Sequence, residues 1–417
     1  MCRRHLVTGV SGVSGWSASV ALSDYFCNFV VKTQPTMTRL LLAFDKFKGS
    51  LRSSDVAHAF SEGWCEVMPD SEVDIVEISD GGDGLVDALV GACGGEYVAV
   101  DVADPLGRPV AARYGTIHNG TTAIIEMAEA AGLRLLAAEE RNPLNTSTRG
   151  VGELIADALG RGCRELIIGL GGSATNDGGT GMLEALGARF YDTMGELVIP
   201  SGEALERVAA VDLAQLDNRL CDTHITIASD VDNPLYGERG AAWVYAPQKG
   251  ADRATVERLD AGLRSYAGVV ASVVGVDMAR CAGAGAAGGV GFALMALLGA
   301  EMQRGIDLML RMVDFEQRVG RCDIVVTGEG RLDRQTLMGK APEGVLNVAR
   351  RVGRDVVAVG GSVAWCDELR TSGFKRIYEA MPEGMTLEEA MRPDVARANL
   401  RRVAERAARE LLAEALI

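Results

Sequence analysis

The sequence has few of the residues that build metal centres, disulfide frameworks and histidine-dependent active sites. Its nine cysteines are scattered singly without a CxxC pair, which indicates neither a zinc site nor a disulfide framework and fits a reducing cytoplasm. The four histidines share no metal-ligand spacing. No stretch of 18 or more residues is continuously apolar, so no membrane span is predicted. These absences favour a cytoplasmic globular protein whose catalysis does not depend on histidine.

Positive charge is also scarce. Asp and Glu number 57 against 42 Lys and Arg, which gives a formal net charge of −15. Long-range repulsion then opposes binding to nucleic acid and to anionic membranes, so neither is expected as a partner. An anionic small molecule would instead need cations placed locally. Only six basic residues are lysines, and four of these lie in or beside glycine-containing loops, where a compact ammonium suits a phosphate: Lys46, Lys48, Lys249 and Lys340.

Strands and helices are expected to alternate at both ends of the chain. The apolar run LLLAF at 40–44 is typical of a buried strand, and the alternation predicts a parallel sheet covered by helices. The expected segments are a strand at 40–44, a helix from about 54, a strand at 73–78, strands at 323–330 and 355–362, and a C-terminal helix from about 387 to 415.

The middle of the chain has a different pattern. YVAV, ARYGTI and TTAIIEM are short strands close together, which indicates a mixed or antiparallel sheet. We therefore predict an α/β fold with a Rossmann-like, doubly wound parallel-sheet domain (37–95 and 285–417) interrupted by an inserted second α/β domain with a mixed sheet (96–284). Residues 1–36 are expected to be an N-terminal extension, either disordered or a start-site artefact, with Met37 as the functional start.

Glycine is abundant, and it gathers in loops that could carry chemistry. The strongest motif is GLGGSATNDGGTG at 169–181, where an apolar strand ends in a loop that opens a helix. Backbone amides and the helix N-terminus predict an anion cradle there, and Asp177 is expected to face a metal or a substrate hydroxyl. An ordinary tight turn is the alternative. The residues expected to bind the cofactor are Gly171, Gly172, Ser173, Thr175, Asn176, Gly178 and Gly179.

Two further loops follow the first strands of the chain. DKFKGS at 45–50 places Asp45 and Lys48 just past a strand, where ligands of doubly wound sheets bind, so Asp45 is a candidate base or metal ligand and Lys48 a phosphate clamp. SDGGDG at 79–84 presents Asp80, a candidate for substrate contact. Solvent-facing charges and plain acidic turns are the alternatives.

Three later loops carry charged residues as well. TGEGRLD at 327–333 follows an apolar strand and combines Glu329, Arg331 and Asp333, although a carboxylate beside an arginine is equally typical of a surface ion pair. SDVDNP at 229–234 holds Asp230, for which turn chemistry is the alternative. In NTSTRG at 145–150, Arg149 is a candidate for binding a substrate carboxylate, while helix capping explains the Ser and Thr residues.

The segment GAGAAGGVG at 283–291 shows GxGxxG spacing through Gly283, Gly285 and Gly288. This spacing is the argument for a dinucleotide-binding oxidoreductase. The segment does not follow a clear strand in a βαβ unit, so close packing of a Gly/Ala stretch is the competing explanation. No Walker A motif is present, which excludes a P-loop kinase.

Taken in order, DKFKGSL, SDGGDG, NTSTRGVGELI, IIGLGGSATNDGGTG, SDVDNPLYG, PQKGA, GAGAAGGVGFAL and VVTGEGRLD closely resemble the bacterial type I glycerate kinase family. The match runs from about residue 39 to the C-terminus. The resemblance implies ATP-dependent phosphoryl transfer to D-glycerate, typically giving 2-phosphoglycerate, on a Rossmann-like domain with an inserted α/β domain. The sequence departs from the family at Phe44, Asp83 and Leu85, where relatives often have proline, glutamate and threonine.

The resulting hypothesis is a kinase whose two domains close over ATP, Mg²⁺ and glycerate. Lys48 is expected to bridge to the transferred phosphoryl group, and one of Asp45, Asp177 and Asp230 to orient or deprotonate the hydroxyl, with Asp177 and Asp230 also candidate metal ligands. The alternatives are an NAD(P)-dependent hydroxy-acid oxidoreductase and a non-catalytic nucleotide-binding regulator, and a homodimer is one expectation for the assembly. The remaining candidates are Gly283, Gly285 and Glu329 for the cofactor, and Asp80, Arg149, Arg331 and Asp333 for the substrate.

Overall fold

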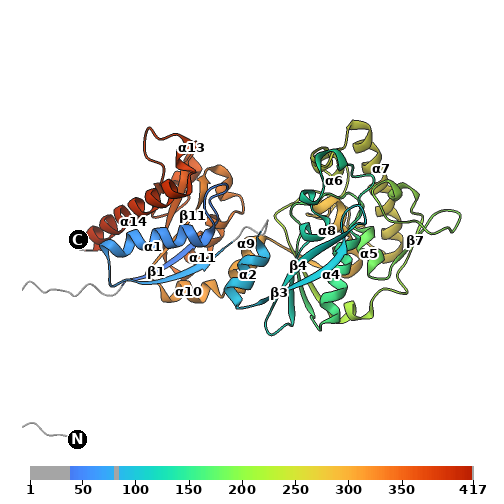
Figure 1. Ribbon diagram of the computed structural model, residues 1–417, viewed down its shortest axis with the longest axis horizontal. Coiled ribbons are helices and arrows are strands. Elements are labelled where there is room, and N and C mark those ends of the chain that lie inside the picture. Colours follow the sequence, from blue (N-terminus) through green and yellow to red (C-terminus); the bar gives the residue numbers. More distant parts are fainter. Residues whose placement is uncertain (1–37, 79–83, 416–417) are drawn as a thin grey trace, which may run out of the picture. The chain divides into compact units, whose positions relative to one another are not determined.

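Two separate main sheets organise the chain in the computed structural model, which describes residues 38–78 and 84–415 (Figure 1). The expectations for residues 1–36 and for Asp80 lie outside the described residues. Among those that are described, no helix has the length and apolar character needed to cross a membrane.

The first sheet has five strands, all parallel, in the order β13-β12-β11-β1-β2. Strands from the two ends of the chain are therefore neighbours, as the alternating pattern predicts. The strands are β1 (Arg39–Phe44), β2 (Glu72–Glu77), β11 (Ile324–Leu332), β12 (Asp355–Val363) and β13 (Arg376–Glu379).

Helices cover both faces of this sheet. Leu40, Leu42 and Phe44 pack with helices α1 (Ser53–Val67) and α14 (Pro393–Ala415), which lie side by side in Figure 1. Leu41 and Ala43 belong to a second core that contains α11 (Ala341–Val352). Successive strand side chains point to opposite faces, so a strand covered on both sides is apolar throughout, which explains LLLAF. The predicted doubly wound α/β architecture is confirmed.

The second sheet has six strands in the order β10-β9-β6-β5-β4-β3. β4 pairs antiparallel with both β3 and β5, whereas β5, β6, β9 and β10 pair parallel with one another in that order. The predicted mixed sheet is therefore confirmed. All six strands lie in the chain between β2 and β11. They are β3 (Glu96–Ala103), β4 (Pro109–Ile117), β5 (Thr122–Glu126), β6 (Glu165–Gly169), β9 (His224–Ala228) and β10 (Glu301–Gln303). The residue bounds given above for the two domains stay a prediction.

The other helices and the small sheet of β7 and β8 complete the described fold. Their bounds are α2 (Leu85–Cys93), α3 (Ala128–Ala131), α4 (Arg149–Gly160), α5 (Thr180–Ala185), β7 (Arg189–Tyr191), β8 (Ala210–Asp212), α6 (Ala241–Tyr245), α7 (Arg253–Val274), α8 (Val290–Leu298), α9 (Gly305–Met312), α10 (Phe315–Arg321), α12 (Asp367–Arg370) and α13 (Leu387–Ala390).

The expected single C-terminal helix from 387 to 415 is wrong. The structure has two helices there, α13 and α14, separated by Met391 and Arg392. Pro393 begins α14, and the residue before a proline is sterically disfavoured in the helical conformation. The interruption between α13 and α14 therefore lies directly before Pro393.

Candidate active site

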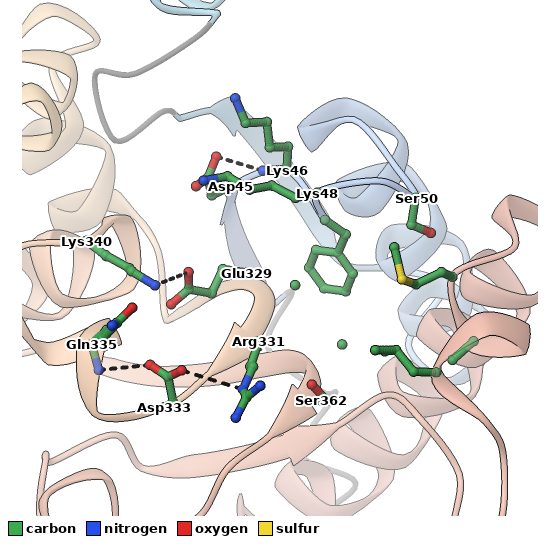
Figure 2. Close-up of a pocket in the computed structure, with 16 residues that line it drawn as sticks. Asp45, Lys46, Lys48, Ser50, Glu329, Arg331, Asp333, Gln335, Lys340 and Ser362 are labelled. Carbon is green, nitrogen blue, oxygen red and sulfur yellow. Dashed lines mark hydrogen bonds and ion pairs between the residues drawn. The ribbon is translucent and has the colours of Figure 1, made fainter. Parts of the chain in front are cut away.

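A pocket of about 370 Å³ lies where the carboxyl ends of β1, β11 and β12 meet. Crevices outside the carboxyl ends of parallel strands are the usual ligand sites of doubly wound sheets. Four basic side chains and three carboxylates line the pocket. The lining residues are Asp45, Lys46, Phe47, Lys48, Ser50, Glu329, Gly330, Arg331, Asp333, Gln335, Lys340, Gly361, Ser362, Leu387, Ala390 and Met391 (Figure 2).

The loop that follows β1 brings Asp45 and Lys48 to this pocket. The backbone N–H of Asp45 donates to the Gly328 carbonyl at 2.9 Å, which fastens the end of β1 to β11. Its carboxylate accepts from the N–H of Lys46 at 2.7 Å and is only 4% exposed. Phe47 and Leu51 exchange two backbone hydrogen bonds, so the loop is closed and Lys48 is left exposed at its tip.

Glu329 is a buried carboxyl group of the pocket whose pKa is perturbed. It is 8% exposed, accepts a hydrogen bond from the Thr336 hydroxyl at 2.7 Å, and lies 3.4 Å from the Lys340 ammonium. Burial raises the pKa of Glu329 above its ordinary value, while Thr336 and Lys340 oppose that shift. A carboxyl with a raised pKa beside a cation, inside a pocket, is a functional-site candidate.

Arg331 and Asp333 lie next to Glu329 along the same strand end. Arg331 Nε is 3.5 Å from the Asp333 carboxylate, and Asp333 also accepts from the N–H of Gln335 at 2.8 Å, at the start of a short 3₁₀ helix (Arg334–Leu337). Figure 2 shows Glu329, Lys340, Asp333 and Arg331 together on one side of the pocket, with Ser50 on the other. The structure thus brings five predicted residues to one place: Asp45, Lys48, Glu329, Arg331 and Asp333.

Five polar lining residues are not among the catalytic, metal, cofactor or substrate residues predicted from the sequence: Lys46, Ser50, Gln335, Lys340 and Ser362. Ser50 belongs to the DKFKGS loop that the sequence singles out. Lys46 and Lys340 had a signal, because they are two of the scarce loop lysines. Gln335 and Ser362 had none, since nothing in their local sequence marks them as facing a ligand. They reach the pocket through the turn after β11 and the end of β12.

The loop 169–181 is not part of this pocket. Gly171 and Gly172 line a second pocket, of about 270 Å³, at the ends of β5 and β6. Glu126, the last residue of β5, also lines it and accepts from the backbone N–H groups of Gly84 and Leu85 at 2.6 and 2.9 Å. The sequence gives no signal for Glu126, because it ends an apolar strand that no glycine-rich motif follows.

Asp177 lies inside the protein, away from both pockets. Its fully buried carboxylate accepts from the Thr148 N–H and hydroxyl, both at 2.8 Å, and from the N–H groups of Gly179 and Gly181 at 3.1 and 3.2 Å. Burial raises the pKa of Asp177, and these hydrogen bonds oppose that shift. The carboxylate therefore joins the loop before α4 to the start of α5. Its predicted role at a metal or hydroxyl stays a prediction.

Lys249 holds the same loop from another side. Its buried ammonium donates to the Ser173 hydroxyl at 2.8 Å and to the Thr175 carbonyl at 2.6 Å. Thr175 and Asn176 are themselves fully buried. Burial lowers the pKa of Lys249 to about 7, with the charge of Asp177 acting in the opposite direction.

The stability of the fold should therefore depend on pH through Lys249. The pKa of this lysine is about 7 in the fold against an ordinary 10.5, so between these values the unfolded chain binds more protons. The free energy of unfolding should rise with pH across this window, by up to about 1.4 kcal/mol per pH unit. Urea unfolding at pH 7 and pH 9 should show wild type gaining stability relative to Lys249→Met. Lys375→Met, at an exposed lysine, is the control. The expectation would be contradicted if wild type and Lys249→Met differed in free energy of unfolding by the same amount at both pH values.

The remaining predicted residues lie elsewhere. Arg149 is exposed and ion-paired with Glu153 and Glu184 at 2.9 and 2.7 Å. Asp230 accepts from the N–H of Gly305, the first residue of α9, at 3.3 Å. Neither residue lines either of these pockets. Their proposed contacts with substrate and metal stay predictions.

The glycine segment 283–291 follows helix α7 and a turn, not a strand. It packs directly against the loop 171–179: Gly178 N–H donates to the Gly288 carbonyl at 3.0 Å, and a Cβ on Gly288 would lie 2.2 Å from the Thr175 carbonyl. A Cβ on Gly285 would lie 2.3 Å from the Pro234 carbonyl. Close backbone packing accounts for glycine at these positions, and the predicted cofactor contacts of Gly283 and Gly285 stay untested.

The fold and the first pocket define an α/β enzyme suited to a phosphate-bearing ligand. A model of the glycerate kinase family matches residues 40–412. Glycerate kinase of Halalkalibacterium halodurans is 42% identical over 85% of this chain and 94% of its own length. Glycerate 2-kinase of Escherichia coli is 43% identical over 85% of this chain and 93% of its own length. A crystal structure from Salmonella typhimurium, of a protein provisionally named glycerate kinase 2, superposes with a TM-score of 0.83 at 41% identity, covering 92% of this chain and all of that one.

The chain belongs to the glycerate kinase family. The resemblance seen in the loop motifs is confirmed, and the chain is a phosphotransferase. The family implies glycerate and ATP as substrates. The oxidoreductase and the non-catalytic regulator are therefore set aside.

Proposed function

We propose that this chain transfers the γ-phosphoryl group of ATP to D-glycerate in the presence of Mg²⁺, giving 2-phosphoglycerate. The observation that supports this most directly is the pocket at the ends of β1, β11 and β12, where Lys48, Lys340 and Arg331 meet the carboxylates of Asp45, Glu329 and Asp333. The product follows the name of the Escherichia coli relative, glycerate 2-kinase.

The basic side chains of the pocket give it local positive charge in a protein that is negatively charged as a whole. A protein of formal charge −15 repels a triphosphate at long range, so binding requires cations placed at the site. Lys48 at the loop tip is proposed to contact the transferred phosphoryl group, with Lys340 and Arg331 on the remaining phosphates. Catalysis of phosphoryl transfer rests on such positioning and charge stabilisation.

The carboxylates fit a magnesium-dependent kinase. Within residues 38–78 and 84–415, no group of three or more acidic, His or Cys side chains could hold a metal by itself. Mg²⁺ in kinases is usually held by one or two carboxylates together with substrate phosphates, where it neutralises developing charge. Asp45 and Asp333 offer such oxygens in the pocket and are the proposed ligands.

Glu329 is proposed as the group that accepts the proton of the glycerate hydroxyl. Its pKa is raised by burial, and an effective general base has a pKa close to the working pH. Asp177, by contrast, already accepts four hydrogen bonds from its own loops, and Asp230 lies outside the pocket. Gly171 and Gly172 are exposed residues that follow β6. We propose that their N–H groups bind the phosphates when the domains close over both substrates.

A coupled assay tests the reaction and its regiochemistry together. The purified protein with ATP, Mg²⁺ and D-glycerate should release ADP, and enolase alone should then form phosphoenolpyruvate, because it accepts 2-phosphoglycerate directly. A signal that appears only after phosphoglycerate mutase is added would assign the product as 3-phosphoglycerate. Absence of glycerate-dependent ADP release would overturn the proposed function. The cytoplasmic location and the homodimer stay predictions.

A further inference from the structure

One wall of the active-site pocket is apolar and exposed. It is formed by Leu387 and Ala390 of α13 and by Met391, which ends that helix; Leu387 is 60% and Met391 36% exposed. We call these three residues the α13 wall. Apolar side chains that are exposed together inside a pocket are a candidate surface for an apolar part of a ligand.

The α13 wall is held in place by local contacts. Thr386 caps α13, because its hydroxyl accepts from the N–H of Glu389 at 3.3 Å while the Glu389 carboxylate accepts from the Thr386 N–H at 3.1 Å. Met391 reaches the loop after β1: a Cβ on Gly49 would lie 2.7 Å from its terminal methyl. The end of this four-residue helix therefore lies beside the loop that carries Lys48.

Between the α13 wall and the charged side, backbone lines the pocket. Gly330 of β11 and Gly361 of β12 are adjacent, and a Cβ on Gly361 would lie 2.5 Å from the Gly330 carbonyl. Side chains therefore do not rise from this part of the pocket. Glu329, Lys340, Asp333 and Arg331 lie on the side opposite Ser50 (Figure 2), and Ser50 follows Gly49, which Met391 contacts. The pocket thus has a charged end and an apolar end.

The two substrates of a glycerate kinase differ in the surface they offer. Glycerate carries a carboxylate and two hydroxyls on three carbons and has no apolar face, whereas ATP joins a flat base to a charged chain. Burial of apolar surface favours the base at the apolar end, and the lysines favour the phosphates at the charged end. We propose that the α13 wall is the subsite for the purine base of the nucleotide, with its triphosphate running toward Lys48 and Lys340. This inference rests on the proposed function of the pocket.

The chemistry of the α13 wall also determines which part of a nucleotide it can recognise. The α13 wall consists of Leu, Ala and Met side chains, which offer apolar area and, apart from the weakly accepting thioether of Met391, no hydrogen-bonding group. The wall should therefore add affinity for any nucleotide over its phosphate chain alone. Inorganic tripolyphosphate, which has the charged chain without the base, is the matching probe.

The test replaces both large side chains of the wall by neutral polar ones of similar size. Leu387→Gln/Met391→Gln should raise the KM for ATP by on the order of 10-fold, because apolar contact area with the base is lost. The KM for glycerate and the inhibition constant of tripolyphosphate should change less than about two-fold, since the charged end is untouched. Leu197→Gln, at another half-exposed leucine outside the pocket, is the matched control and should leave all three constants unchanged.

The outcomes separate this inference from the proposed function. If wild type shows no glycerate-dependent ADP release, the proposed function fails, and calorimetric binding of ATP and of tripolyphosphate to the same proteins still tests the α13 wall. An unchanged ATP constant in the double variant overturns the inference. A rise in the KM for glycerate alone also overturns the inference, because the α13 wall would then contact glycerate or a segment that closes over it. Equal weakening of ATP and tripolyphosphate would also overturn it, because the base would then make no separate contribution.

Discussion

Replacing Lys48 by alanine should lower kcat by on the order of 10²-fold or more while leaving the protein folded. Lys48 is exposed at the tip of a loop that two backbone hydrogen bonds between Phe47 and Leu51 close without it, so its removal costs the fold little. In the proposed mechanism, the ammonium stabilises the charge that spreads over the oxygens of the transferring phosphoryl group in the transition state. The loss should therefore appear in kcat more than in the KM for glycerate.

Lys375→Ala provides the matched control for this experiment. Lys375 is ion-paired with Asp355 and Glu414 next to β13, outside the active-site pocket, so kcat should be unchanged in that variant. Thermal unfolding should show similar stability for both variants. A Lys48→Ala enzyme with wild-type kcat would remove this residue from the site.

Replacing Glu329 by glutamine should lower kcat by roughly 10²- to 10⁴-fold, the usual contribution of a general base. The amide cannot accept the hydroxyl proton, although it keeps the size of the side chain and can accept a hydrogen bond from Thr336. Wild-type kcat/KM should fall as the pH drops through the pKa of Glu329. Because burial raises that pKa, the acid limb should lie above the ordinary value of 4.5, and it should be absent from the residual activity of Glu329→Gln.

Thr336→Val gives a second measurement on the same carboxylate. The hydrogen bond from Thr336 lowers the pKa of Glu329, and the valine variant lacks it. The acid limb of kcat/KM should therefore lie at higher pH in Thr336→Val than in wild type. Glu257→Gln, at an exposed glutamate on α7, should leave the profile unchanged. The role of Glu329 as base would be excluded by a Glu329→Gln enzyme that kept wild-type kcat and the wild-type pH profile.

Much of the fold was predictable because the apolar pattern of each strand reflects which of its faces the helices cover. The run LLLAF indicated a strand buried on both faces, and both faces of β1 are indeed covered by helices. The short strands after residue 96 indicated the mixed sheet, and β4 is indeed antiparallel to both β3 and β5. The prediction of one C-terminal helix was wrong, because Pro393 disfavours the helical conformation at the residue before it and divides the helical pattern into α13 and α14.

The candidate site was predictable in part. Strand ends and scarce lysines indicated Asp45, Lys48 and Glu329, which do share one pocket. Glycine content alone could not show which loops face a ligand. The Asp177 carboxylate accepts hydrogen bonds from Thr148 and Gly179 and lines neither of the two pockets. Lys340, by contrast, lies at the start of α11 and lines the pocket beside Glu329.

The sequence by itself determined the two sheets, the positions of the loops at strand ends and the family, because hydrophobic periodicity and the order of motifs are properties of the chain. Only the tertiary structure decided which of those loops meet, which carboxyl group is buried beside a lysine, and which apolar side chains stay uncovered in the pocket. Those facts depend on how β1, β11 and α13 approach one another. Burial and pKa arise from neighbours that are far apart in the sequence, so no local pattern encodes them.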